Sequence, residues 1–313
     1  MAEARLGGRR HVVFRRACGG ATSPGYLTAA RRVQAGVRRR LVARRAGGGA
    51  SSRDERNEEN NRFSPNRAFQ VLIGCDGVSS VVAKWLGLPK PILSGRSATR
   101  GLAEYPGGHC FGPEILQFIG QGFRSGVLPC SDTSVYWNYT WYPSPADGDA
   151  EESVAKMRNH VLGKLRAAKI PAAALDAIER SEMSGVVSSP LRFRSPLALL
   201  RGSISRGGVC VAGDALHPMT PELGQGGCAA LEDGVVLARC LGEAFAAATM
   251  GAALEKYAEA RRWRSIQLIT AAYVVGFIQQ SNNVVVKFLR DTFLSPLLAK
   301  TLVAMADYDC GTL

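Results

Sequence analysis

Two segments of the sequence end a short apolar run in a turn of glycine and aspartate. Residues 69–74 lead into the turn at 75–77, and residues 209–212 lead into Gly213 and Asp214. An aspartate at a strand end accepts hydrogen bonds from sugar hydroxyls, and glycine lets a ligand approach the backbone. The helix that follows each turn offers free N–H groups to a phosphate. These residues therefore indicate a nucleotide-binding site.

The second turn continues into a loop rich in proline and glycine, residues 215–227, and then into a helix expected to begin near Cys228. The run GDALHPMTPELGQGG at 213–227, followed by Glu232 and Asp233, resembles the GD motif of the group A flavin-dependent monooxygenases, the aromatic hydroxylases. GCDGVSS at 74–80 resembles the DG motif of that family. The resemblance covers residues 68–265 and is nearest to the plant-type branch related to zeaxanthin epoxidase and salicylate hydroxylase-like enzymes.

The resemblance implies an enzyme that binds FAD and uses NAD(P)H and O2 to hydroxylate or epoxidise an aromatic or isoprenoid-like apolar molecule. The oxygen donor would be a C4a-hydroperoxyflavin, so no catalytic acid or base is assigned. Asp214 would bind the ribityl chain, Pro221 would lie along the isoalloxazine, and Asp76 would lie near the pyrophosphate and the path of NADPH. The expected cofactor-binding residues are Asp76, Gly77, Gly213, Asp214, Ala215, His217, Pro218, Pro221, Gly224, Gln225, Gly226 and Gly227.

Several of these residues also have a structural interpretation. Asp-Gly is an ordinary turn dipeptide, so Asp76 alone is compatible with a turn-forming role. His217 precedes a proline and is better explained as a loop-shaping residue than as a proton donor. Cys228 is expected to pack at the helix start, with a reactive thiol as the alternative.

Two further sets of side chains are expected to be structural. The basic residues of a later helix are expected to form a solvated face. Three alternating aromatic residues are expected in the core, with the wall of a substrate pocket as the alternative. The residues are Arg261, Arg262 and Arg264, and Trp137, Tyr139 and Trp141.

The elements that position the motifs follow from apolar periodicity and turn residues. A helix capped by Ser79 and stopped at Gly87 follows the first turn, with Val82, Trp85 and Leu86 on one face. Residues 92–145 are β-rich, with strands at 115–119, 126–128 and 135–141. Helices are expected at 150–170 and 171–180, a strand at 186–193, and mostly helix over 254–306. An apolar stripe marks the helix from 228, at Leu231, Val235, Ala238, Leu241 and Phe245.

These elements predict an α/β fold of the FAD/NAD(P)-binding three-layer type, incomplete at its N-terminus, with an inserted β-rich substrate lobe and C-terminal helices. Residues 68–92 and 187–255 would form the FAD-binding domain and residues 93–186 the lobe. Residues 256–313 would form the C-terminal helical region. We expect those helices to cap the flavin domain, with weak contact to a membrane surface as the alternative. The longest apolar stretch, residues 268–278, is too short to span a bilayer.

The N-terminal segment, residues 1–67, differs in composition from the rest of the chain. The chain carries a net charge of +13, and residues 1–70 hold 16 Arg against 5 acidic residues. A flexible solvated arm with a short strand at 11–14 is the first interpretation, and an organelle transit segment is the second. A nucleic-acid-binding tail is the third, and no nucleic-acid partner is expected. Coding bias or an altered exon or reading frame would produce the same composition.

The same segment lacks a motif that the resemblance implies. No Gly-x-Gly-x-x-Gly, which would hold the AMP half of FAD, occurs in residues 1–67. The alternative function is therefore a truncated, catalytically impaired member of the family that binds FAD weakly or not at all.

The eight cysteines contain no CxxC pair, so no metal is expected. The cysteines also favour a reducing intracellular compartment, the cytoplasm before a plastid.

Overall fold

The computed structural model describes residues 2–6, 9–15, 71–120, 122–143, 153–245, 250–281, 283–289, 292 and 304–311. The contacts within the chain divide it into two units, one made of Met1–Arg15 with Gln70–Leu313 and the other of Arg16–Phe69. Every element below belongs to the first unit. The alternatives for the arginine-rich segment concern mainly residues 16–67, which lie outside the described residues.

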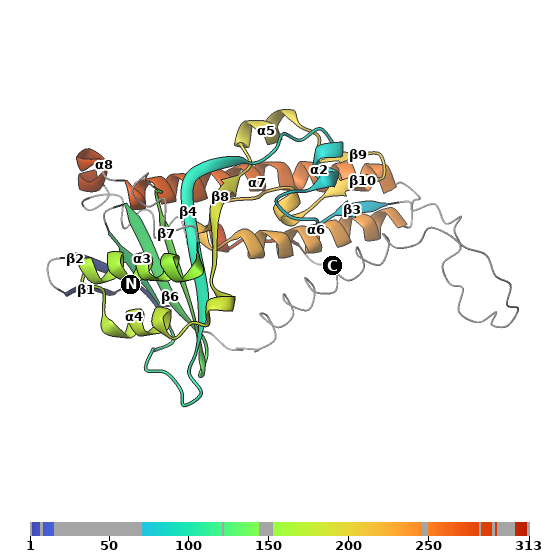
Figure 1. Cartoon of the computed structure of the whole chain (residues 1–313). Helices are drawn as coiled ribbons and strands as arrows, with labels where there is room; N and C mark the ends of the chain where they lie inside the picture. Colours follow the sequence, from blue (N-terminus) through green and yellow to red (C-terminus); the bar gives the residue numbers. More distant parts are fainter. Residues whose placement is uncertain are drawn as a thin grey trace, which may run out of the picture. The chain divides into compact units, whose positions relative to one another are not determined.

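The predicted lobe, residues 93–186, supplies most of a sheet of seven antiparallel strands (Figure 1). Residues 2–6, 9–15 and 187–193 add strands to the same sheet from outside those bounds. The strands predicted at 115–119, 126–128, 135–141 and 186–193 are confirmed as β5, β6, β7 and β8, and the strand at 11–14 lies within β2. β4 lies within the range 92–145 that was predicted to be β-rich, but no separate strand was predicted there, because Ser, Gly, Thr and Arg interrupt its apolar residues. In spatial order the strands are β1 (Ala2–Leu6), β2 (Arg9–Arg15), β5 (Glu114–Ile119), β6 (Phe123–Ser131), β7 (Ser134–Trp141), β4 (Ile92–Glu104) and β8 (Val187–Phe193).

One face of this sheet forms an apolar core with two helices. Side chains alternate between the faces of a strand, so Trp137, Tyr139 and Trp141 of β7 share one face. They pack in a single apolar cluster with residues of α3 (Val154–Ala167) and α4 (Ala172–Glu179). The prediction that these aromatic residues belong to the core is confirmed, and both helices lie within their predicted ranges.

A smaller sheet of three strands lies outside the lobe. β3 (Leu72–Gly74) pairs in parallel with β10 (Val209–Val211), which pairs with β9 (Ser205–Arg206). β10 is buried in an apolar cluster with residues of the two long helices α6 (Gly226–Phe245) and α7 (Met250–Gln280). The remaining short elements are η2 (Met183–Gly185), α5 (Pro196–Arg201), η3 (Gly213–Ala215) and η4 (Pro221–Leu223).

The helix after β3 is α2 (Val81–Trp85), and its ends are set by two local signals. The N-cap is Ser80, whose Oγ accepts from Ala83 N at 2.8 Å, so the predicted cap at Ser79 is wrong by one residue. Gly87 ends the helix with φ +85°, as predicted, because glycine enters the left-handed region without steric cost. Trp85 does not share the buried face. It is exposed, and the Arg206 guanidinium lies over its ring.

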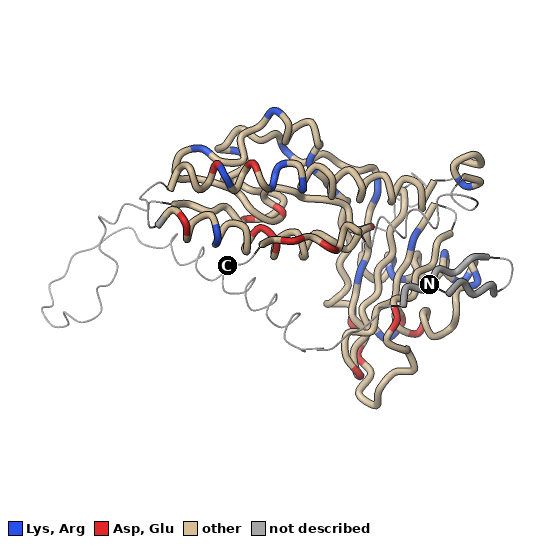
Figure 2. Tube along the Cα trace, turned by 180° about the vertical axis from the view of Figure 1, so that it is seen from behind, with Lys and Arg blue, Asp and Glu red and all other residues tan. Residues whose placement is uncertain are grey.

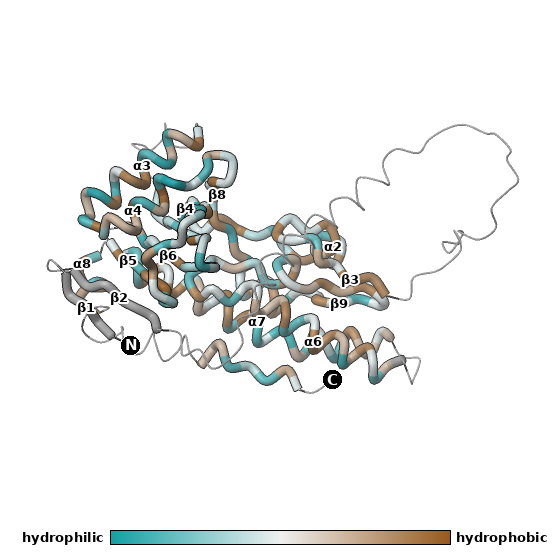
Figure 3. The backbone as a smooth tube through the Cα atoms, turned by 90° about the horizontal axis from the view of Figure 1, so that it is seen from below, coloured by the Kyte–Doolittle hydropathy of each residue, from teal (hydrophilic) through white to brown (hydrophobic). Residues whose placement is uncertain are grey.

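The buried face of α6 is not the apolar stripe marked in the sequence. Leu231 is 59% exposed, whereas Val236, Leu237 and Cys240 on the other side of the helix are buried. Both sides of α6 are apolar, so periodicity alone does not choose between them. Leu72 and Ile73 of β3 are also exposed, at 52% and 38%, and Figure 3 shows this strand as hydrophobic.

The helical C-terminal region begins with α7 and continues into α8 (Val284–Leu289). The helix expected over 254–306 is confirmed in part, since residues 290–303, apart from 292, lie outside the described residues. Within the described ranges, none of the helices has the length and apolar character needed to cross a membrane.

Candidate functional site

The two glycine–aspartate turns lie side by side. β3 and β10 are parallel neighbours, and Ala212 N donates to Gly74 O at 3.0 Å just where both strands end. Asp76 and Asp214 follow these strand ends, and both are exposed. Ligands of open α/β sheets bind at the carboxyl ends of the strands. The structure therefore brings the predicted DG and GD segments to one edge.

Asp76 organises the first turn. Its carboxylate accepts from Val81 N at 2.7 Å and from Val82 N at 3.4 Å, so it satisfies free N–H groups at the start of α2. Gly77, with φ +80°, gives the turn its left-handed step. Asp76 therefore has the turn-forming structural role that the sequence left open for it.

The second turn runs into a loop whose residues divide between surface and interior. Gly224 closes η4 in the left-handed region at φ +66°, and its N–H donates to Pro221 O at 3.0 Å. α6 then begins at Gly226, two residues before the predicted start. Of the predicted cofactor residues in this segment, Asp214, Pro221, Gly224 and Gly227 are exposed, Gly213, Gln225 and Gly226 are half-buried, and Ala215, His217 and Pro218 are buried. Cys228, expected to pack, is exposed.

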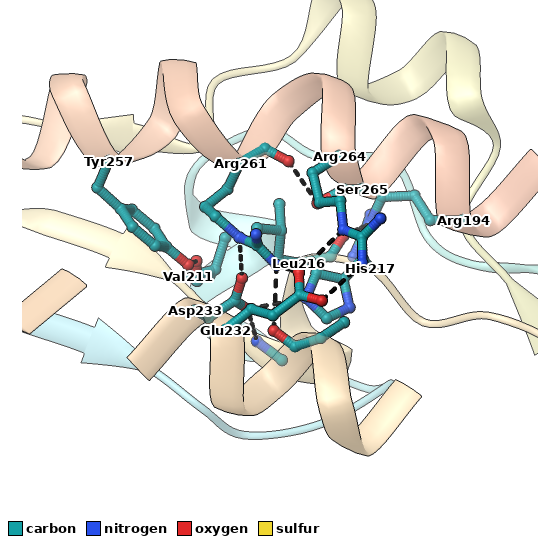
Figure 4. Close-up of polar contacts among 12 residues, drawn as sticks. Arg194, Val211, Leu216, His217, Glu232, Asp233, Tyr257, Arg261, Arg264 and Ser265 are labelled. Atoms are coloured by element: carbon teal, nitrogen blue, oxygen red, sulfur yellow. Dashed lines mark hydrogen bonds and ion pairs between the residues drawn. The ribbon is translucent and has the colours of Figure 1, made fainter. Parts of the chain in front are cut away.

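Asp233 of α6 holds the second turn in place (Figure 4). Its Oδ2 accepts from Gly213 N at 2.6 Å and from His217 Nε2 at 2.8 Å, and its Oδ1 accepts from Arg261 Nε at 2.6 Å. Burial by itself would raise the pKa of Asp233, but the hydrogen bond from His217 and the charge of Arg261 bring it below its ordinary value. His217 therefore has the loop-shaping contact that its sequence context favoured.

The basic residues of α7 are not a solvated face, and that prediction is wrong. Arg261 is fully buried, and Arg264 is 7% exposed. Arg264 donates to Glu232 through Nε at 3.0 Å and Nη2 at 2.6 Å, and Arg261 Nη2 donates to Glu232 at 2.8 Å. Arg262 donates to backbone carbonyls near α5. The carboxylate partners of Arg261 and Arg264 are Glu232 and Asp233 of α6, so the sequence around the arginines gave no sign of them. Figure 2 shows basic and acidic positions along two neighbouring helices.

The same arginines hold the segment 304–311. Arg264 Nη2 donates to Met305 O at 2.7 Å. The Tyr308 ring lies 4.5 Å from Arg264 Cζ and 5.1 Å from Arg261 Cζ, which are cation–π distances. This cluster of Asp233, Glu232, Arg261, Arg264 and Tyr308, hereafter the Asp233 network, joins the turn at Gly213 to a distant part of the chain.

A second buried ion pair adjoins the loop. Glu222, which follows Pro221, is paired with Arg96 of β4, and both side chains are almost completely buried. Gln280 Nε2 at the end of α7 also donates to Glu222, at 3.3 Å. Sequence analysis missed this pair, and it missed the function of Asp233 although the motif included that residue. The one sequence signal for the buried pair was Glu222, a carboxylate directly after Pro221, the proline expected to face the flavin.

This fold and these turns define an α/β nucleotide-binding protein, and comparison with known proteins makes the class specific. The chain is 46% identical over 259 residues to Monooxygenase 2 of Arabidopsis thaliana, an alignment that covers 78% of this chain and 63% of the relative. It is 34% identical over 257 residues to Monooxygenase 1 of the same plant, again over 78% and 63%. A solved structure of Klebsiella pneumoniae HpxO complexed with FAD and uric acid shares the fold, with a TM-score of 0.62 at 24% identity over 77% of this chain and 61% of that one.

The family follows from a separate match. The family model described as FAD binding domain matches residues 26–272, and the chain belongs to this family. The family's cofactor is therefore FAD, as the motifs implied. The chain spans 63% of the length of the two plant relatives.

The described residues fit the flavin half of FAD. Asp214 presents an exposed acceptor for a sugar-alcohol hydroxyl, and Pro221 presents an exposed apolar surface. A Cβ added at Gly224 or Gly227 would meet nothing within 4 Å, so the loop is open to a flat ligand at these positions. For the AMP half, β3 is an edge strand in the described part of the chain, and none of the described residues provides a further Gly-rich turn beside it.

Proposed function

We propose that the chain is a flavoprotein oxidoreductase, an FAD-dependent monooxygenase that uses NAD(P)H and O2 to hydroxylate or epoxidise an aromatic or apolar small molecule. The observation that carries the proposal is the turn Gly213–Ala215 at the carboxyl end of β10, where Asp214 is exposed and the backbone is fixed by Asp233. The hydrogen bond from Gly213 N to the buried Asp233 carboxylate fixes the backbone of this turn, and recognition of a bound cofactor requires a backbone fixed in this way.

The parts of the chain then have distinct roles. Residues 68–92 and 187–255 bind FAD, residues 93–186 form the substrate lobe, and residues 256–313 complete the structure around the Asp233 network. Asp214 accepts a hydrogen bond from the ribityl chain, and Pro221 with the 224–227 backbone contacts the ring system. The N-terminus of α6 favours negative charge on the pyrimidine side by about 0.3–1 kcal/mol. FAD, when bound, supplies the reaction with oxygen, while the protein orients the substrate and excludes water.

The compartment is proposed from the cysteines. The seven cysteines within the described residues are all free, which agrees with a reducing intracellular environment. We place the chain in the cytoplasm before a plastid, and we keep weak membrane-surface contact through the C-terminal helices as the alternative to a purely structural cap.

The experiment that tests the function is a visible absorption spectrum of the purified chain after incubation with FAD and removal of free cofactor. Retained oxidised-flavin bands, followed by substrate-dependent NADPH oxidation, are the expected result. The Asp214→Ala variant should retain less flavin, whereas Glu255→Ala, at an exposed position of α7, should retain as much as the unchanged chain. Equal retention by both variants would remove Asp214 from the site.

One observation favours a second candidate, an incomplete family member with weak or no FAD binding. The exposed side chains of Leu72, Ile73 and Leu231 leave apolar surface on β3 and α6 without a partner among the described residues. The sequence of residues 1–67 also lacks the Gly-rich phosphate motif. A colourless protein after the same incubation would select this candidate over the enzyme.

A further inference from the structure

Arg194, the residue that follows β8, contacts the second glycine–aspartate turn and its loop through both its main chain and its side chain (Figure 4). Its N–H donates to Pro218 O at 3.0 Å, Nε donates to Leu216 O at 2.9 Å and Nη2 donates to Ala215 O at 3.0 Å. A fourth hydrogen bond runs from Nη1 to Pro89 O. Arg194 therefore fixes the path of the chain directly after the turn.

The Arg194 guanidinium is a buried positive charge without a carboxylate partner among the described residues. The residue is 1% exposed, and the hydrogen bonds of its side chain all end on main-chain carbonyls. Burial lowers the pKa of Arg194, and no neighbouring charge within the described part of the chain counteracts this effect. Arginine nevertheless stays charged in proteins. The carbonyl dipoles satisfy its N–H groups but do not cancel its charge.

The buried ion pairs on the other side chains around the turn leave this charge unbalanced. The Asp233 network pairs two carboxylates with two guanidiniums, so these four groups carry no net charge. The charge of Arg194 is additional to them. Water screens a buried charge only weakly, so its field extends to a ligand bound at the turn.

This charge has a consequence for the cofactor that we assign to the turn. FAD gains negative charge on its ring system when it is reduced, and a fixed positive charge nearby favours that form. We propose that Arg194 is a positioning residue that holds the 215–218 backbone and makes the site bind reduced FAD more tightly than oxidised FAD. This inference rests on the proposed function, because it requires FAD at Asp214. The same preference favours electron transfer from NAD(P)H to the bound flavin.

The test measures the affinity of the full chain for oxidised FAD, and for FAD reduced with dithionite under nitrogen, by equilibrium dialysis at mildly alkaline pH. The unchanged chain should bind reduced FAD more tightly. Arg194→Met removes the charge and should lower the ratio of the two affinities about tenfold, the effect of one unit charge at about 12 Å with an effective dielectric constant of about 20. Arg194→Lys loses the planar fork but keeps the charge, so it should keep the ratio although both variants lose stability.

Arg262→Met is the matched control for the loss of main-chain contacts. Arg262 also donates to carbonyls, those of Leu199 and Gly202, and both lie outside the loop at 213–227. This variant should lower the midpoint of thermal unfolding, as Arg194→Met does, and leave the affinity ratio unchanged. A purely structural role of Arg194 would instead give the Lys and Met variants the same ratio.

Equal affinity of the unchanged chain for the two forms of FAD would overturn the inference. This measurement needs no variant, so it also decides the question if Arg194→Met fails to fold. An unchanged ratio in a folded Arg194→Met variant, or an equal fall in Arg194→Lys or Arg262→Met, would also overturn it. In each of these cases FAD still binds and the proposed function stands. A chain that binds neither form of FAD would overturn the proposed function and the role of Arg194 together.

Discussion

Replacing Asp233 by asparagine should destabilise the whole FAD-binding part of the chain. The side chain keeps its shape, so no cavity forms. The three groups that donate hydrogen bonds to it, Gly213 N, His217 Nε2 and Arg261 Nε, then face a neutral amide. The amide NH2 also donates, so one donor must stay unpaired, and Arg261 keeps only Glu232 as a charged partner. Removing one member of a buried ion pair costs about 3–5 kcal/mol. That is a large share of the roughly 5–15 kcal/mol by which domains are stable.

The loss is measured as the midpoint of thermal unfolding by circular dichroism at pH 7, where about 3–5 kcal/mol corresponds to roughly 6–20 °C. Glu243→Gln is the control, because it breaks only an exposed pair with Lys256 and should leave the midpoint unchanged. Arg261→Met should cost less in the Asp233→Asn background than alone, since the two residues share one interaction. An Asp233→Asn midpoint within about 2 °C of the unchanged chain would refute the structural role given to the Asp233 network.

Three further predictions concern the same fold. Because the folded-state pKa of Asp233 is lowered, its contribution to the free energy of unfolding is complete above the unfolded pKa of about 3.9 and is lost as pH falls below it. Urea midpoints of Asp233→Asn should therefore depend less on pH in that range than those of the unchanged chain. Gly276→Ala should lower the free energy of unfolding by about 1–3 kcal/mol, because the added Cβ overpacks the buried ion pair. Gly163→Ala, in α3 with nothing within 4 Å of the added Cβ, should raise it by about 0.5–1 kcal/mol. Changes of the same sign for both variants in urea unfolding would contradict the packing. Leu237→Ala should cost about 2–5 kcal/mol and Leu231→Ala less than about 0.5 kcal/mol, and equal losses in the same assay would mean that α6 buries a different face.

Local chemistry made much of the fold predictable. The stop at Gly87 and the turn at Gly213 depend on the freedom of glycine at positive φ, which is a property of single residues. The core position of Trp137 follows from alternation along one strand. β4 was predicted only as part of a β-rich range and not as a separate strand, because its pairing with β7 and β8, and not its own apolar content, makes it a strand.

The site was predictable only where a motif carries it. The turns around Asp76 and Asp214 were located from sequence, and their roles toward FAD remain proposals. Arg96 and Glu222 are 126 residues apart, and no pattern within either segment indicates that they meet. Arg261 and Arg264 were expected to face solvent, because a run of arginines on a helix looks the same whether or not a second helix supplies carboxylates.

The insertion of the lobe between β3 and β10 also bears on the order of folding. These two strands pair although the whole lobe separates them in sequence. Within the lobe, the first residue of β4, Ile92, is paired with the last residue of β8, Phe193, so the folded lobe brings its own entry and exit together. A preformed lobe shortens the chain that must close roughly fourfold, which lowers the entropic cost of pairing β3 with β10 by about 1 kcal/mol. The pairing of β4 with β8 therefore also shortens the path between Gly74 and Val209, the strand residues next to the two glycine–aspartate turns.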